Sequence, residues 1–118
     1  MSYVDGYLLA VPKKKIKAYK AMAKYGEKIW RRHGALDYKE CVGDDLKTKM
    51  FVPFTRVMKT KPGETVVFSY IVFKSRAHRD RVNAAVMKEM EKMEHPGDMP
   101  FDMKRMVYGG FESLVGFK

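Results

Sequence analysis

Hydrophobic residues recur along the chain at two different spacings, and each spacing predicts a different kind of element. Residues 3–11 are rich in Val, Leu and Tyr and stop at Pro12, which is typical of a β-strand. From Ile16, apolar and small residues recur every three or four positions, which predicts a helix with Gly34 as its C-terminal cap. The expected buried side of this helix comprises Tyr19, Ala23, Gly26, Trp30 and His33.

The middle of the chain returns to strand-like spacing. Residues 35–42 predict a second strand, a polar turn follows at residues 43–45, and residues 55–59 predict a short third strand. Pro62 and Gly63 suit the two central positions of a type II turn. Residues 55–59 and 65–73 are therefore expected to pair as an antiparallel hairpin.

The last third contains a second helix and a final strand. Ser75 is a candidate N-cap, and the sequence His95-Pro96-Gly97 is expected to end the helix. Its expected buried side comprises Val82, Ala85, Val86, Met90 and Met93. Residues 104–112 predict the final strand, in which Gly109-Gly110 indicates a bulge or a close backbone approach.

This order of elements predicts a ferredoxin-like α+β fold, a split βαβ arrangement with both helices on one face of an antiparallel sheet. Residues 1–118 are expected to form a single such domain. Both faces of residues 65–73 are apolar, although a sheet with one solvated face alternates apolar and polar residues. A second copy of the sheet is therefore expected to cover the face away from the helices, as a homodimer.

Composition and charge indicate the cellular compartment of the protein but do not identify a specific partner. A single cysteine precludes an intramolecular disulfide, the first residues lack the basic start of a signal peptide, and no early apolar run is long enough to span a membrane. We therefore expect a cytoplasmic protein. The formal net charge of +10 favours anionic partners in general.

Short motifs spread over nearly the whole chain indicate a family. They include Tyr3-Val4-Asp5-Gly6, Gly34-Ala35-Leu36, Met99-Pro100-Phe101-Asp102 and Tyr108-Gly109-Gly110-Phe111-Glu112. These motifs resemble the YbaA-like family of uncharacterised small bacterial proteins, a domain-of-unknown-function family within the dimeric α+β barrel superfamily. The resemblance implies a ferredoxin-like protomer and a barrel-like dimer of two facing sheets, and it brings no established activity. The lysine-rich first helix and residues 46–51 depart from the family pattern.

Two carboxylates share a strand face with apolar neighbours. Asp5 lies on the same strand face as Tyr3 and Tyr7, and Glu40 lies on the same face as apolar residues of the second strand. A carboxylate that faces a core or an interface must be paired or lose its charge. One interpretation is a structural ion pair with Arg105 or Lys104 at the dimer interface. The other is a small polar site in which a carboxylate acts as a base.

Residues 98–108 form a second candidate site. The loop ending at Asp102 delivers Lys104 and Arg105 beside Tyr108, which would suit an anion-accepting pocket with apolar walls. The alternative is that the loop packs on a dimer mate while Asp102 caps the turn. The candidate pocket for a small ligand, either simply bound or turned over by a cofactor-independent enzyme, comprises Asp5, Glu40, Asp102, Lys104, Arg105 and Tyr108.

The exposed side of the first helix is basic and supplies an alternative function. Its cations are Lys13, Lys17, Lys20, Lys24, Lys28 and Arg31. Such a face would suit RNA or DNA, but a solvated lysine face is commoner, and the aromatic residues needed for base stacking belong to the buried side.

No metal or cofactor is expected from the sequence. None of the three histidines has a second ligand at helical spacing, and His33 continues the buried side of the first helix, which favours a structural role. Cys41 has no neighbouring histidine and is expected to be a small buried residue rather than a nucleophile.

Overall fold

The computed structural model describes residues 2–93 and 99–117, and the predicted helix stop at 95–97 lies outside them. In these residues the chain forms four strands and three α-helices. In chain order they are β1 (Tyr3–Pro12), α1 (Ile16–Arg32), β2 (Asp37–Val42), α2 (Phe54–Val57), β3 (Glu64–Phe73), α3 (Arg76–Glu91) and β4 (Val107–Glu112). Short 3-10 turns precede α1 (η1, Lys13–Lys15) and β4 (η2, Met103–Arg105).

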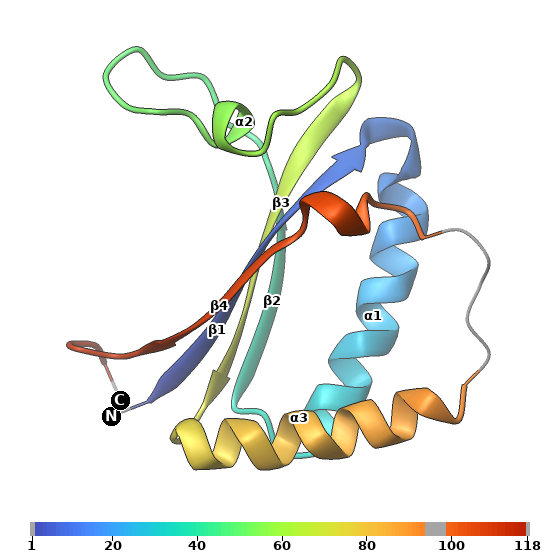
Figure 1. Cartoon of the computed structure of the whole chain (residues 1–118), viewed down its shortest axis with the longest axis vertical. Helices are drawn as coiled ribbons and strands as arrows, with labels where there is room; N and C mark the ends of the chain where they lie inside the picture. The colour runs from blue at the N-terminus through green and yellow to red at the C-terminus, as the bar shows by residue number, and fades with distance from the viewer. Residues whose placement is uncertain (1, 94–98, 118) are drawn as a thin grey trace.

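The strands form one antiparallel sheet in the order β2-β3-β1-β4. Helices α1 and α3 cover one face of the sheet, while the segment carrying α2 and the C-terminal residues extend on the other side (Figure 1). The predicted α+β class is confirmed, and the order is consistent with a ferredoxin-like split βαβ arrangement.

The predicted strand at residues 55–59 is wrong, because Phe54–Val57 form the short helix α2 instead. The predicted hairpin is wrong as well, since β3 is paired on its two edges with β1 and β2. The turn into β3 is as predicted: Gly63 has a φ of 83°, and the Glu64 N–H donates to the Lys61 carbonyl at 3.0 Å.

The helix ends follow the predicted capping chemistry. Gly34 has a φ of 106°, the left-handed conformation that commonly follows a helix C-terminus. The Ser75 hydroxyl accepts the His78 N–H at 3.1 Å and so caps α3. The pair Gly109-Gly110 sits in regular register opposite Gly6 and Asp5 without a bulge. A Cβ at Gly110 would lie 2.5 Å from the Tyr3 hydroxyl oxygen, so the expected close approach is made by a side chain.

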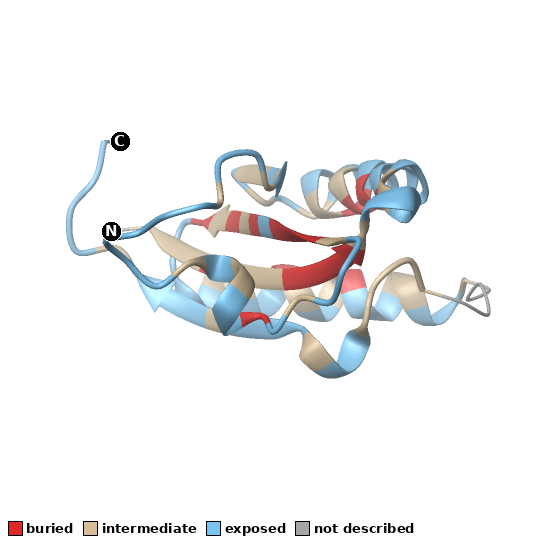
Figure 2. Ribbon diagram, turned by 90° about the horizontal axis from the view of Figure 1, so that it is seen from above, coloured by how far each residue is buried: buried red, intermediate tan, exposed pale blue. Residues whose placement is uncertain are grey.

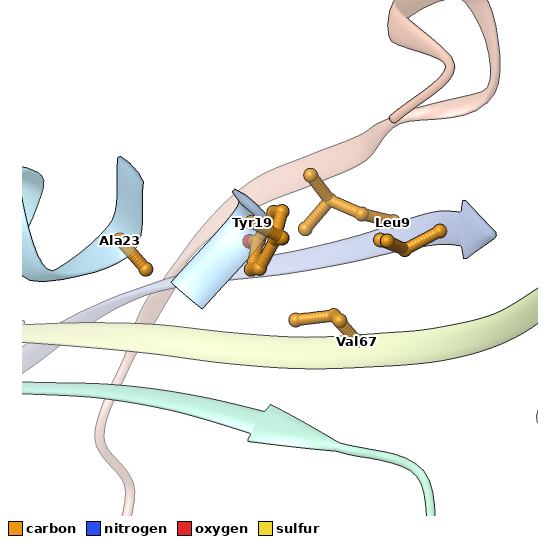
Figure 3. Packing of buried hydrophobic residues seen from close by; sticks show 5 residues of the cluster. Leu9, Tyr19, Ala23 and Val67 are labelled. Carbon is orange, nitrogen blue, oxygen red and sulfur yellow. The ribbon is translucent and has the colours of Figure 1, made fainter. Parts of the chain in front are cut away.

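The core lies between the helices and the sheet, and its buried residues concentrate on the central strands (Figure 2). Under α1, Tyr19 and Ala23 pack against Leu9 and Val67 (Figure 3). A second cluster joins Ile29 of α1 with Ile71 and Phe73 of β3 and with two residues of α3, Val82 and Val86. Burial of these apolar side chains, each contributing roughly 1.5–3 kcal/mol, fixes both helices on this face.

The other face of the sheet, here called the open face, is covered only in part by the chain. Ala10 and Val66 are buried there under Met58 and Leu46, whereas Phe68 is 44% exposed and Phe111 is 62% exposed. Cys41 is exposed on β2, opposite Phe68, so the prediction that it is buried is wrong in the protomer. Cys41 shares its strand face with the polar Asp37 and Lys39, which explains its exposure.

Candidate functional site

Glu40 lies on the helix-facing side of β2 and is held by two tyrosines. The Tyr19 hydroxyl of α1 donates to Oε1 at 2.7 Å, and the Tyr38 hydroxyl of β2 donates to Oε2 at 2.6 Å. Short hydrogen bonds to a carboxylate are stronger than neutral ones. The carboxylate is therefore fixed in one orientation between the helix and the sheet.

The hydroxyls of Tyr19 and Tyr38 keep their protons and donate hydrogen bonds to Glu40. Burial, followed by the hydrogen bond to Glu40, raises the pKa of both Tyr19 and Tyr38 well above the ordinary value for tyrosine. The pKa of Tyr7, next along the sheet, is also raised by burial and then by the charge of Asp5. All three phenols are therefore protonated at neutral pH.

Small residues of α1 make this arrangement possible. Gly26 is buried, and a Cβ built at this position would lie 2.9 Å from the Tyr38 hydroxyl oxygen. Ala23, one turn earlier, is 8% exposed and packs against the sheet. Helix α1 therefore approaches the sheet closely through these two residues, which gives Tyr38 the room to reach Glu40.

A cavity of about 330 Å³, here called the inner cavity, opens beside Glu40 between the helices, the sheet and residues 99–106. Its lining is aromatic and methionine-rich, and the aromatic residues are Tyr7, Tyr19, Trp30, Tyr38 and Phe101. Six methionines complete most of the wall, including Met99, Met103 and Met106. Among the described lining residues, Glu40 is the single acid and none is Lys, Arg or His. Cavities of this size and character are typical of small-molecule sites.

A second recess, here called the outer recess, lies on the other side of Glu40 along the β2 edge. It measures about 570 Å³ and shares Tyr19, Ala23, Tyr38 and Glu40 with the inner cavity. Its remaining lining includes Lys20, Lys24 and Lys39, together with Glu27. Glu40 therefore lines both the inner cavity and a recess whose lining includes charged side chains.

Asp5, the other candidate carboxylate, is fully buried and paired within the protomer. Its Oδ1 accepts from Arg79 Nη1 at 3.2 Å, and its Oδ2 accepts from Asn83 Nδ2 at 3.1 Å. Arg79 also donates to the hydroxyls of Tyr3 and Tyr108. The predicted partners Arg105 and Lys104 are therefore wrong for Asp5, and this cluster ties α3 to β1 and β4.

Arg105 forms a third cluster, here called the clasp. It donates to both carboxylate oxygens of Glu64, at 2.8 and 2.6 Å, to Asp102 at 2.8 Å, and to the Lys59 carbonyl at 3.2 Å. Asp102 also caps η2 by accepting the Lys104 N–H at 2.9 Å. The clasp fixes the segment that carries Met103 and Met106 along the cavity wall.

The predicted site residues thus fall into separate places. Glu40 lines the cavity, Asp5 and Tyr108 belong to the Arg79 cluster, Asp102 and Arg105 belong to the clasp, and the Lys104 side chain is exposed. The helix cations Lys13, Lys17, Lys20, Lys24, Lys28 and Arg31 are all exposed. His33 Nε2 lies 2.7 Å from Glu89 Oε1 and joins α1 to α3. Sequence reasoning missed Tyr19 and Tyr38 as partners of Glu40, although Tyr38 shares its strand face.

Two further findings bear on the chemistry of the described residues. Across residues 2–93 and 99–117, no three His, Cys, Asp or Glu side chains gather as a metal site would require. Within the same ranges, none of the helices is long and apolar enough to cross a membrane.

The fold and the cavity define a small α+β protein with a two-layer helix and sheet architecture. Residues 2–103 match the family described as "Protein of unknown function (DUF1428)", and the chain belongs to this family. It is 40% identical over 115 residues to the "Uncharacterized protein YbaA" of Escherichia coli strain K12, with 98% of each chain covered, and equally similar to the protein of that name from Shigella flexneri. The predicted resemblance is confirmed. A solved structure, "De novo designed protein Foldit4", matches 96% of the chain with a TM-score of 0.50 at 12% identity, which is a likeness of fold alone.

Proposed function

We propose that this protein binds a small, largely apolar molecule in the inner cavity, with Glu40 as the polar contact. The supporting observation is a carboxylate fixed by two tyrosine hydroxyls at the wall of an aromatic and methionine-rich cavity. Such a carboxylate orients a bound molecule, and in a cofactor-independent enzyme it would serve as the base that takes a proton from the substrate.

A cavity-filling variant tests this proposal. Ala23 lines both the inner cavity and the outer recess, so Ala23→Leu adds bulk to both. Ala21→Leu makes the same change at an exposed position of α1. A compound library is screened by thermal shift against the parent and both variants. Compounds that stabilise the parent and the Ala21→Leu variant, but not the Ala23→Leu variant, support the proposal. Hits that survive in both variants would place binding elsewhere.

A homodimer through the open face is the second part of the proposal. Phe68, Val107 and Phe111 are 44, 47 and 62% exposed on this face, and a second apolar sheet is the simplest surface to cover them. Light scattering at micromolar concentration is expected to give twice the protomer mass of 13.7 kDa. Phe68→Glu should shift the protein toward the protomer, while Tyr25→Glu on α1, where the tyrosine is 49% exposed, should not. A parent that scatters as a single protomer would refute the dimer.

Binding of an anionic macromolecule is the alternative function. It is supported by the exposed basic side of α1, where Arg31 pairs with Glu27 at 3.8 Å and the lysines face solvent. Retention on random RNA or DNA at low salt that falls steeply with ionic strength would favour it. Absence of retention at low salt would exclude it.

A further inference from the structure

We infer that the inner cavity selects apolar molecules whose polar group donates hydrogen bonds and carries no negative charge. The inference rests on the proposed ligand-binding function and adds the chemical class of the ligand. The net charge of +10 by itself favours anionic ligands, which is the opposite of the preference inferred for the inner cavity.

The donors and acceptors at the cavity wall indicate which polar group fits beside Glu40. An ionised carboxylate offers about four acceptor positions, and Tyr19 and Tyr38 occupy one on each oxygen of Glu40. The remaining positions can accept a hydrogen bond from a ligand. The phenol protons of Tyr19 and Tyr38 are committed to Glu40, and the Trp30 indole N–H is committed to Asn83 Oδ1 at 3.1 Å. The cavity wall therefore offers acceptor positions on Glu40 and few uncommitted donors.

The charge of Glu40 disfavours an anionic ligand. An anionic head beside Glu40 would meet a like charge, and no Lys, Arg or His among the described lining residues offsets it. The hydroxyls of Tyr7 and Ser69 also line the cavity, but a neutral hydroxyl does not cancel like-charge repulsion. Lys20 and Lys24 line the outer recess and not the inner cavity, so neither supplies a cation to the inner wall.

Four naphthalene probes of similar size separate the possibilities. A naphthol supplies a neutral donor, a naphthylmethylammonium supplies a cationic donor, a methoxynaphthalene supplies no donor, and a naphthoate supplies an anion. Trp30 is the only tryptophan in the chain and lines the inner cavity, so its indole N–H signal in a nitrogen-15 NMR spectrum reports this cavity and not the outer recess. Titration of the full chain gives a Kd for each probe.

The naphthol or the ammonium probe, or both, should bind at least about tenfold more tightly than the other two, since hydrogen bonds to charged groups contribute enough for such a factor. Comparison of the Kd values of these two probes shows whether the cavity prefers a neutral or a cationic donor group. Glu40→Gln should weaken the donor probes about tenfold and improve naphthoate, because the amide removes the charge and adds a donor. Glu27→Gln, which alters the outer recess only, should change neither.

The titrations distinguish ligand binding in the inner cavity from the inferred preference for donor groups. If naphthoate or methoxynaphthalene binds as tightly as the donor probes, the inference fails while ligand binding in the cavity stands. If no probe perturbs the Trp30 signal in the parent, the ligand-binding proposal fails together with the inference.

Discussion

Replacing Glu64 with Gln tests the clasp that fixes residues 101–106 along the cavity wall. Both oxygens of Glu64 accept from Arg105, and the Glu64 side chain is only 10% exposed. The Arg105 guanidinium lowers the pKa of Glu64 from 4.5 to about 2. Gln keeps the shape of the side chain and removes the charge, so the change isolates the electrostatic part of the contact.

The direction of the pH effect follows from the lowered pKa. The stabilisation is complete above about pH 4.5, where the carboxyl is ionised in both states, and is lost as the pH falls toward 2. Lowering the pKa of one carboxyl by this amount corresponds to at most roughly 3 kcal/mol. Solvent reaches part of the pair and screens it, so we expect Glu64→Gln to lose about 1–2 kcal/mol at pH 7.

Urea unfolding followed by Trp30 fluorescence measures this loss over a series of pH values. The difference between the parent and the Glu64→Gln variant should be largest near pH 7 and should shrink steadily below pH 4.5. Glu91→Gln, an exposed carboxyl at the end of α3, is the matched control and should show a much smaller difference. A Glu64→Gln difference that stays constant from pH 7 into the acid range would refute an electrostatic clasp.

Three further substitutions have definite expected outcomes. Gly26→Ala should not yield the ~1 kcal/mol that Ala usually adds in a helix interior, because its Cβ would lie 2.9 Å from the Tyr38 hydroxyl; a full gain in the urea midpoint would contradict the close approach. Asp5→Ala should cost about 3–5 kcal/mol, since it leaves Arg79 without its buried partner; a loss below about 1 kcal/mol would show that the pair is unimportant. Ser75→Ala should cost about 1 kcal/mol by thermal unfolding, with Ser75→Thr as the conservative control that retains the cap.

The parts of the fold that sequence predicts are those with a repeated local signal. The buried residues Tyr19, Ala23 and Gly26 of α1 and Val82 and Val86 of α3 follow from spacings of three and four, although the prediction misses the fully buried Ile29. The two apolar faces of β3 follow from apolar residues at both odd and even positions. The segment 54–57 carries no such signal, because one turn of helix is too short to show a period, and Val57 with its neighbours has the composition of a strand.

The candidate site is predictable only where its residues share an element. Alternation along β2 places Tyr38 beside Glu40, and the same alternation places Cys41 with the polar residues of the open face. Tyr19 is 21 residues from Glu40, and Arg79 is 74 residues from Asp5, so these contacts depend on how α1 and α3 dock. Local periodicity shows which side of a helix is buried but not which residue meets it.

Alternation along β3 also sets how this protein can diverge. Ser69 and Ile71 line the cavity, whereas their immediate neighbours Phe68 and Tyr70 point to the open face. Substitutions at Ser69 or Ile71 therefore alter the lining of the cavity, and substitutions at Phe68 or Tyr70 alter the open face. One ten-residue strand therefore contributes to both surfaces in alternation, so the sequence of either surface can change without changing the other.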